Sequence, residues 1–347
     1  MDTNMIPKVS VIMPVFNGEK YIGKAMNSIL RQTFTDFELI IINDGSTDGS
    51  MEIVKSFKDK RIAIVENERN TGLAAVRNQG LSTSRGNFVA FLDCDDISYP
   101  DRLEREVAFL EAHSDFGLVG TYTRLIDALD KPTGIFWREY IPWEKFPIRI
   151  MFGNMFTTSS VMLRKTALPE IRFREGFAPA EDYEMWTRML KKCKGCNIPK
   201  ILTDYRTHDT GTSVTKKTLQ QNAIDRIIMS ELKEIGIEPA PEELSLHRKS
   251  YGFAGTDEET KKFLAARLKW LLKLIEQNQN AGRFPSKMFE EVMAEMWLGS
   301  CDANARLGLK TWKIFRESPL SKSIRWRGNF KKLAKFALKC LLSKDKI

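Results

Sequence analysis

Cysteine is scarce in this 347-residue sequence, which contains only five of them. An odd number scattered along a chain of this size is typical of a protein from a reducing compartment and argues against a disulfide framework. The pair Cys193 and Cys196 has no second pair at a suitable spacing. We therefore expect two thiols at a helix-end turn rather than a zinc site.

Long apolar runs and glycine-rich nucleotide motifs are also missing. The sequence has no stretch of about 18 apolar residues and no N-terminal signal pattern, so we expect neither a membrane-spanning helix nor secretion by a cleaved signal. The motifs GxGxxG and GxxxxGK(S/T) are absent, which disfavours dinucleotide dehydrogenases and P-loop NTPases. Any bound phosphates would have to be held in another way.

The net charge of +9 lies almost entirely at one end of the chain. Residues 322–347 carry nine basic side chains against one acidic side chain, a net charge of +8, and the rest of the chain is almost neutral. Because the charge is confined to a tail, we expect no nucleic-acid partner. With 42% apolar residues and no low-complexity tract, the chain should be globular.

The order of apolar segments predicts an α/β protein. The first hundred residues alternate short apolar runs with helix-period segments, as βαβ units of a parallel sheet do. We predict strands over 8–13, 37–42, 61–66 and 88–92, and helices near 19–31, 47–57 and 72–84. After residue 100 the pattern is mixed, with further strand-like segments over 116–126, 158–163 and 201–205, and we expect antiparallel additions to the sheet. Later segments are helical, so we place domains at 1–214, 215–321 and 322–347.

Three polar segments directly follow predicted strands, at 14–17, 43–46 and 93–96. In an open α/β sheet, ligands bind outside the carboxyl ends of the strands, so these segments should converge. The last segment brings three carboxylates within four residues, and they cannot all stay ionised away from water unless a cation offsets them. Because Mg²⁺ or Mn²⁺ takes oxygen ligands, a metal-bound, phosphate-bearing substrate is the leading hypothesis. A solvated acidic turn is the alternative.

Two further side chains could face a nucleotide. Asp44 lies in a tight strand-to-helix turn, where it would accept a hydrogen bond from a base or ribose, or else satisfy the local backbone. Arg77 lies in the helix after the third strand, where it would face the nucleotide, lie on a solvated surface, or pair with a nearby Asp. These residues alone leave the alternatives open.

Six segments, in this order and spacing, resemble the inverting family 2 glycosyltransferases of the type that builds bacterial cell-surface polysaccharides. That family has the nucleotide-diphospho-sugar transferase (GT-A) fold, and the resemblance covers roughly residues 8–213. The segments are Val-Ser-Val-Ile-Met-Pro-Val-Phe-Asn at 9–17, Ile-Ile-Asn-Asp-Gly-Ser-Thr-Asp at 41–48, Asn-Thr-Gly-Leu-Ala-Ala-Val-Arg-Asn at 70–78, Asp-Cys-Asp-Asp at 93–96, Glu181-Asp182, and Tyr-Arg-Thr-His at 205–208.

The resemblance implies a role for each matching residue. Asp44 and Arg77 would contact the base, and Asp93 the ribose region. Asp95 would bind the Mn²⁺ or Mg²⁺ that bridges the diphosphate, and His208 would approach the metal or diphosphate from the other side of the cleft, with a structural role as the alternative. The whole set that would line the nucleotide pocket is Pro14, Val15, Asn17, Glu19, Asp44, Arg77, Asp93 and Cys94.

Asp182 matches the family's catalytic base. A sugar hydroxyl is a poor nucleophile at neutral pH, and a carboxylate that takes its proton contributes about 10² to 10⁴ in rate. A metal on the leaving diphosphate would supply Lewis-acid stabilisation from a separate segment. Glu181 is the alternative base, and both carboxylates also complement the dipole at the start of a helix.

The tail is predicted to form an amphipathic helix. At about 100° per residue, Leu342 falls on the basic side. With Trp326 near its start, such a helix resembles an interfacial anchor for an anionic membrane surface, and a helix docked on the protein itself is the alternative. Its predicted apolar face holds Phe330, Leu333, Ala334, Ala337, Leu338 and Leu341, and its predicted basic face holds Lys331, Lys332, Lys335 and Lys339.

We therefore expect a metal-dependent inverting glycosyltransferase that moves a sugar from a nucleotide-diphosphate sugar, UDP being the family's common nucleotide, to a hydroxyl of a glycan or lipid-linked glycan. It would be cytoplasmic and peripheral on the cytoplasmic face of the membrane. One rival is a nucleotidyltransferase that makes nucleotide sugars, but it needs a glycine-rich phosphate loop and residues 14–18 offer one glycine. A second rival is a non-catalytic scaffold of a polysaccharide assembly complex.

Overall fold

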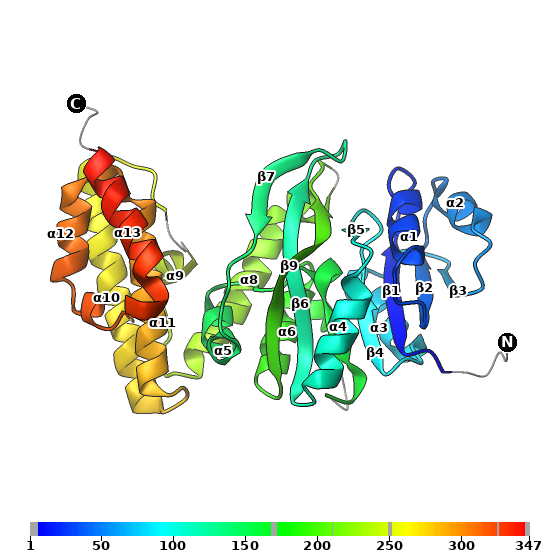
Figure 1. Ribbon diagram of the computed structural model, residues 1–347, viewed down its shortest axis with the longest axis horizontal. Coiled ribbons are helices and arrows are strands. Elements are labelled where there is room, and N and C mark those ends of the chain that lie inside the picture. Colours follow the sequence, from blue (N-terminus) through cyan, green and yellow to red (C-terminus); the bar gives the residue numbers. More distant parts are fainter. Residues whose placement is uncertain (1–5, 168–171, 210, 249–251, 325, 344–347) are drawn as a thin grey trace. The chain divides into compact units, whose positions relative to one another are not determined.

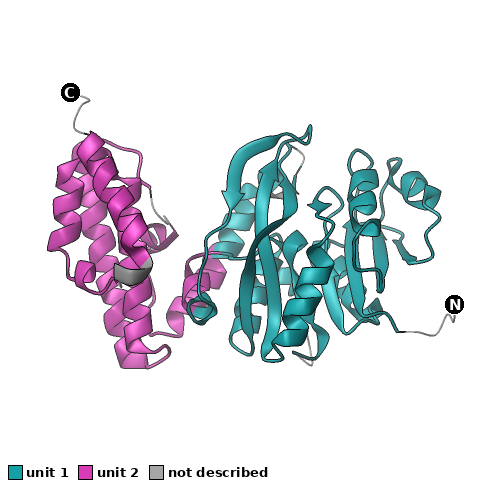
Figure 2. Ribbon diagram, in the orientation of Figure 1, with its two compact units in different colours: residues 1–147, 154–224 teal, residues 148–153, 225–347 magenta. Residues whose placement is uncertain are grey.

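The chain folds into two compact units. Unit 1 comprises residues 1–147 and 154–224, and unit 2 comprises residues 148–153 and 225–347 (Figure 2). The computed structural model describes residues 6–167, 172–209, 211–248, 252–324 and 326–343, without the side chains of residues 212, 213 and 326–328. Within these ranges, no helix combines the length and the apolar character needed to cross a membrane.

Unit 1 is built on a nine-stranded mixed sheet (Figure 1). The strand order is β3-β2-β1-β4-β8-β6-β9-β5, and β7 pairs with β6 outside this path. Strands β1 to β4 are parallel, β8 is antiparallel to β4 and β6, and β9 runs parallel to β6. The strands are β1 (Val9–Val15), β2 (Phe37–Asp44), β3 (Ile62–Asn67), β4 (Phe88–Phe91), β5 (Ile97–Ser98), β6 (Phe116–Ile126), β7 (Pro132–Trp137), β8 (Met162–Arg164) and β9 (Lys194–Arg206).

The helices connect these strands and then make up most of unit 2. They are α1 (Ile22–Leu30), α2 (Ser50–Ser56), α3 (Leu73–Thr83), α4 (Arg102–Ala112), α5 (Phe146–Arg149), α6 (Glu181–Leu190), α7 (Thr212–Thr215), α8 (Lys217–Lys233), α9 (Pro241–Arg248), α10 (Asp257–Ala281), α11 (Ser286–Ala303), α12 (Leu309–Glu317) and α13 (Trp326–Leu342). The α/β class, the four parallel strands and the antiparallel additions predicted from the sequence are confirmed.

Helices cover both faces of the sheet because its central strands are apolar on both sides, as parallel strands usually are. β1 and β2 are buried along their whole length. Alternate residues such as Val11 and Met13 join one core with side chains of α1, α2 and α4. On the other face, α3 lies so close to β1 that a Cβ on Gly80 would be 2.5 Å from Ile12. α6 covers the same face through Trp186, whose ring lies 6.1 Å from that of Phe91.

The strand predicted over 158–163 is wrong in its first half. Thr158–Ser160 form a 3₁₀ turn, and the strand β8 begins only at Met162. The turn is closed by hydrogen bonds from the Ser160 N–H to Thr157 O and from the Val161 N–H to Thr158 O. The Ser160 hydroxyl also donates to Thr157 O at 2.8 Å, and small hydroxyl side chains favour such local bonds over a sheet ladder. This turn lies beside the polar cluster described below.

The core of unit 2 is formed by packed helices. Trp297 and Phe289 of α11 and Trp270 of α10 are buried in it. His247 of α9 stacks on Phe152 with ring centroids 4.3 Å apart, so the short segment 148–153 belongs to this unit. Close packing of large side chains of this kind supplies most of the stability of a helical unit.

Candidate active site

The polar segments that follow β1 and β2 are joined by side-chain hydrogen bonds. Asn17 Oδ1 accepts from the Thr47 N–H at 2.9 Å, and Glu19 Oε2 accepts from the Gly49 N–H at 3.0 Å. Pro14 and Val15 are the buried last residues of β1. The predicted convergence at the carboxyl ends of the strands is confirmed for the segments after β1 and β2, and Cys94 after β4 lies beside Gly18. Contact of these segments with a nucleotide stays a prediction.

Asp44 holds the loop that leads into α3. Its Oδ1 accepts from the Thr71 N–H and the Thr71 hydroxyl, both at 2.8 Å, and its Oδ2 accepts from the Gly72 N–H at 3.0 Å. The carboxylate is buried, and the backbone that it binds lies 27 and 28 residues further along the chain, not in its own turn as one alternative from the sequence had it. Its contact with a base stays a prediction.

Arg77 on α3 lies between two carboxylates from different elements. Its guanidinium donates to Glu181 Oε1 at 2.8 Å and to Asp93 Oδ1 at 2.9 Å, and the arginine side chain is only 3% exposed. The ion pair with a nearby Asp, one alternative from the sequence, is therefore present, together with a second carboxylate that the sequence did not suggest. A contact between Arg77 and a base stays a prediction.

The carboxylates of residues 93–96 remain neighbours, but each has a different partner. Asp93 pairs with Arg77, Asp95 bonds to His208, and Asp96 is buried and accepts from the Arg206 N–H at 2.8 Å. Burial, followed by the charges of Asp95 and Asp93, raises the pKa of Asp96 well above its ordinary value. Part of the expected positive charge thus comes from Arg77 of the protein itself.

Cys94 lies between these carboxylates and is packed against the loop after β1. Its sulfur would be 2.8 Å from a Cβ added to Gly18, so the two segments touch with no room for a larger residue. Burial, followed by the charges of Asp95 and Asp93, raises the pKa of the Cys94 thiol well above its ordinary value. A neutral thiol here adds no further negative charge to the acidic segment.

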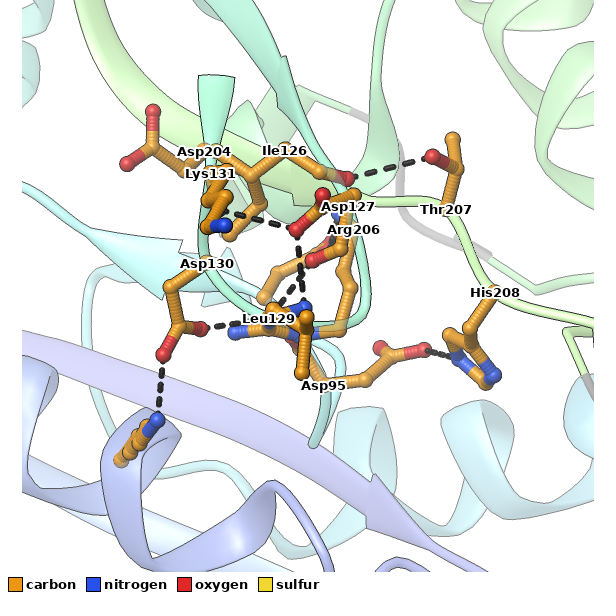
Figure 3. A network of polar contacts seen from close by, with 12 residues as sticks. Asp95, Ile126, Asp127, Leu129, Asp130, Lys131, Asp204, Arg206, Thr207 and His208 are labelled. Atoms are coloured by element: carbon orange, nitrogen blue, oxygen red, sulfur yellow. Dashed lines mark hydrogen bonds and ion pairs between the residues drawn. The ribbon is translucent and has the colours of Figure 1, made fainter. Parts of the chain in front are cut away.

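Asp95 and His208 meet from two different strand ends (Figure 3). His208 Nε2 lies 2.9 Å from Asp95 Oδ2, and the two side chains are 12% and 28% exposed. Two ligands that bind one octahedral ion at about 2.1 Å would lie about 3 Å apart, so this spacing fits a shared cation. Among the described residues, no three His, Cys, Asp or Glu side chains are grouped to hold a metal alone. This pair could supply two ligands of a metal site.

Arg206 is a site residue to which the sequence analysis gave no role. Its side chain is fully buried, and its Nε donates to the backbone oxygen of Asp95 at 2.7 Å. It also pairs with Asp130 at 2.5 Å, in the turn between β6 and β7 (Figure 3). Its guanidinium stacks on the ring of Tyr21, 4.5 Å from the ring centroid. Arg206 therefore fixes the backbone that carries Asp95. Its position in the segment 205–208 was the available signal.

Asp182 lies in the first turn of α6 and is half-buried. Its Oδ2 accepts hydrogen bonds from Asn154 Nδ2 and from the Thr158 hydroxyl, both at 2.9 Å. Neighbouring Glu181 is 2% exposed and is bound by Arg77. Asp182 is thus the more accessible of the two candidate bases. Its partners Asn154 and Thr158 carry no signal in the sequence, because Thr158 begins the predicted strand 158–163 and Asn154 lies outside every predicted element.

Comparison with known proteins agrees with this arrangement. Residues 10–170 match the family described as Glycosyl transferase family 2. The Escherichia coli UDP-Glc:alpha-D-GlcNAc-diphosphoundecaprenol beta-1,3-glucosyltransferase WfaP is 30% identical over 237 residues, which cover 66% of this chain and 87% of WfaP.

Solved structures show the same fold. Residues 1–349 of Staphylococcus aureus TarS, in complex with UDP, superpose with a TM-score of 0.51 at 18% identity, over 94% of this chain and 91% of TarS. The Pyrobaculum calidifontis mannosyltransferase PcManGT, in complex with GDP-Man and Mn²⁺, gives a TM-score of 0.51 at 16% identity, over 99% of this chain and 90% of PcManGT. The predicted GT-A fold and glycosyltransferase class are confirmed, and the chain belongs to glycosyltransferase family 2.

Proposed function

We propose that this glycosyltransferase is metal-dependent and inverting, and that it moves a sugar from a UDP-sugar to a hydroxyl of a glycan or lipid-linked glycan during synthesis of a surface polysaccharide. The observation that carries the proposal is that Asp95 and His208, from the segments after β4 and β9, lie 2.9 Å apart, whereas Asp182 lies on a separate helix, α6. Attack and departure of the leaving group need separate groups on opposite faces of the sugar, and this separation supports an inverting reaction.

The proton acceptor in this scheme is Asp182. The carboxylate would take the proton of the acceptor hydroxyl as that oxygen attacks the anomeric carbon, and the bond to the diphosphate breaks on the opposite face. Asn154 and Thr158 donate to the same oxygen, Oδ2, and so hold the carboxylate in one orientation. A base held in place contributes more than a mobile one, because less orientational freedom is lost in the transition state.

The leaving diphosphate would be held on the side of Asp95 and His208. A divalent ion bound there would neutralise the charge that develops on the diphosphate. The two side chains supply one carboxylate and one imidazole, and the remaining ligands would be phosphate oxygens and water. Arg206 would keep Asp95 in place through the backbone oxygen.

Donor and acceptor are proposed from similar proteins. The TarS structure contains UDP, and the name of WfaP gives UDP-Glc as donor and a diphosphoundecaprenol-linked sugar as acceptor. Both support a UDP-sugar and a lipid-linked glycan here. The GDP-Man in PcManGT makes a second nucleotide worth testing. A lipid-linked acceptor would place the reaction at the cytoplasmic face of a membrane.

The test is release of nucleoside diphosphate from UDP-Glc, UDP-GlcNAc and GDP-Man, each with Mn²⁺ or with a chelator. We expect release from one donor, its loss with the chelator, and its loss in Asp95→Asn. Asp115→Asn is the matched control, because Asp115 is an exposed aspartate paired with Lys194 and touches none of the site residues. Metal-independent release, or equal release by both variants, would contradict the metal assignment.

The role of Asp182 is tested separately. Asp182→Asn should bind the donor with unchanged affinity in calorimetry but lose transfer to membrane glycolipid extract, because the amide accepts no proton. If Glu181 were the base instead, Asp182→Asn would keep most of its transfer rate.

A further inference from the structure

The last helix, α13, packs on unit 2 through one side only. Leu333, Phe336 and Cys340 are buried, and the Phe336 ring lies 5.4 Å from Trp312 and 5.5 Å from Phe315 of α12. Lys339 Nζ is paired with an aspartate of α11, at 2.6 Å from Asp302 Oδ2. The helix is therefore fixed in its rotation, and its opposite side has a defined composition.

That opposite side carries large apolar side chains without a partner in the described structure. Phe330 is 63% exposed, Leu338 and Leu341 are each 55% exposed, and Leu342 is 67% exposed. Of the large apolar side chains that are exposed in the described part of unit 2, only Met229 lies outside α13. Such a concentration on one helix marks a contact surface rather than ordinary scattered exposure.

Lysines border this apolar stripe. At about 100° per residue, Phe330, Leu341, Ala334 and Leu338 fall within about 80°, and Lys331, Leu342 and Lys335 occupy the next 60° or so. We call these seven residues the α13 outer face. It differs from the predicted apolar face, because Leu333 is used for docking and Phe336 and Cys340, outside that prediction, are used as well. The side chain of Trp326 lies outside the described residues.

We propose that the α13 outer face binds the surface of an anionic lipid membrane while the buried side of the helix stays docked on unit 2. An interfacial helix needs an apolar stripe to enter the acyl boundary and basic residues beside it to meet anionic headgroups. The α13 outer face has both in one continuous arc. The two alternatives from the sequence, membrane anchor and docked helix, are thus combined in one element.

Charge favours this occupant over a second copy of the chain. A two-fold contact through the same face would bring Lys331 and Lys335 of both copies together, where like charges repel. The region 322–347, with a net charge of +8, would add to that repulsion, whereas an anionic surface attracts it. The inference rests on the proposed function for its purpose, because a lipid-linked acceptor lies at a membrane.

The test is flotation of the full chain with vesicles of phosphatidylcholine alone or mixed with phosphatidylglycerol. We expect binding to the mixed vesicles that weakens with salt. Leu338→Glu with Leu341→Glu should lower the bound fraction by at least about tenfold, because both leucines would enter the lipid. Lys331→Gln with Lys335→Gln should lower binding by roughly fivefold per lysine, and only on the mixed vesicles.

Leu219→Glu is the matched control, because Leu219 is a helical leucine of similar exposure, 59%, in unit 1. All variants should keep the wild-type melting temperature, since the changed side chains are exposed. Absence of vesicle binding by the wild type, or equal binding by the leucine double variant, would overturn the proposal. A wild-type dimer that dissociates in the leucine double variant would also overturn the proposal, because it would identify a second copy of the chain as the occupant. Nucleotide release needs no vesicles, so failure of the proposed function would be seen separately.

Discussion

Replacing Arg77 by alanine should destabilise unit 1 strongly. The change leaves two carboxylates, of Asp93 and Glu181, without the charge that compensates them. Removing one partner of a buried ion pair costs about 3 to 5 kcal/mol. Glu181 is 2% exposed but Asp93 is 28% exposed, so most of the loss comes from Glu181 and we expect about 3 kcal/mol, the low end of that range.

The loss in the Arg77 variant should depend on pH. Burial raises the pKa of Asp93 and of Glu181 already in the wild type, where Arg77 opposes the shift. Without Arg77 the pKa of each rises further, so the folded state binds more protons than the unfolded state over a wider pH range above their ordinary values. The stability of the variant therefore increases as pH falls through that range. The difference in unfolding free energy between wild type and variant should be smaller at pH 5 than at pH 7.

The assay is urea unfolding at these two pH values, followed by tryptophan fluorescence, since Trp186 lies on the same helix as Glu181. Arg105→Ala is the control, because Arg105 is 47% exposed in a surface pair with Asp101 and should contribute less than about 1 kcal/mol. A loss below about 1 kcal/mol in Arg77→Ala, or a loss that grows as pH falls, would refute the reasoning.

Three further predictions follow from single groups. Burial raises the pKa of Glu106 to about 7 despite its pair with Arg102, so this group should make wild-type stability fall as pH rises from about 4.5 to 7. Glu106→Gln should make that slope less steep in urea titrations, by up to about 1.4 kcal/mol per pH unit. Burial lowers the pKa of His247 to about 3, so unit 2 should lose stability as pH falls below about 6.5, by up to about 1.4 kcal/mol per pH unit. NMR of the folded protein at pH 5 should show a neutral His247 ring. Thr158→Val removes one donor to Asp182, and should lower kcat about tenfold with an unchanged KM for the donor in steady-state assays.

The sheet could be predicted because its information is local. The apolar runs are Val11–Met13 in β1, Leu39–Ile42 in β2 and Phe88–Phe91 in β4, and short runs of this kind between turn residues are typical of strands buried on both faces. The turn at 158–160 could not be predicted in the same way. Its residues are buried like those of a strand, but the Ser159 hydroxyl accepts a hydrogen bond from the Asp93 N–H at 3.0 Å, a contact 66 residues distant in sequence.

The acidic residues and Arg77 of the candidate site were predictable from the motifs, but their pairing and the supporting residues Asn154, Thr158 and Arg206 were not. Three motifs supplied Arg77, Asp93 and Glu181, but which carboxylate meets the arginine depends on how α3 and α6 pack beside each other on the same sheet face. The role of Arg206 could be recognised only by its place in the segment 205–208. The sequence does not distinguish a buried arginine that donates to a backbone oxygen from an exposed one. Long-range packing therefore decided which side chains pair, and the sequence alone could not.

For the tail helix, too, the sequence identifies the residues but not their contacts. A helical projection identifies residues that share a face, but the apolar arc of α13 is wider than one interface, running from Phe336 through Leu333 to Leu338. Docking uses the part that meets Trp312 and Phe315 on α12. The remaining apolar part stays in water unless something else covers it, and burial of each such side chain is worth about 1.5 to 3 kcal/mol. A helix with lysines beside that uncovered part has a physical reason to meet a second surface, and an anionic membrane satisfies both its apolar and its basic residues.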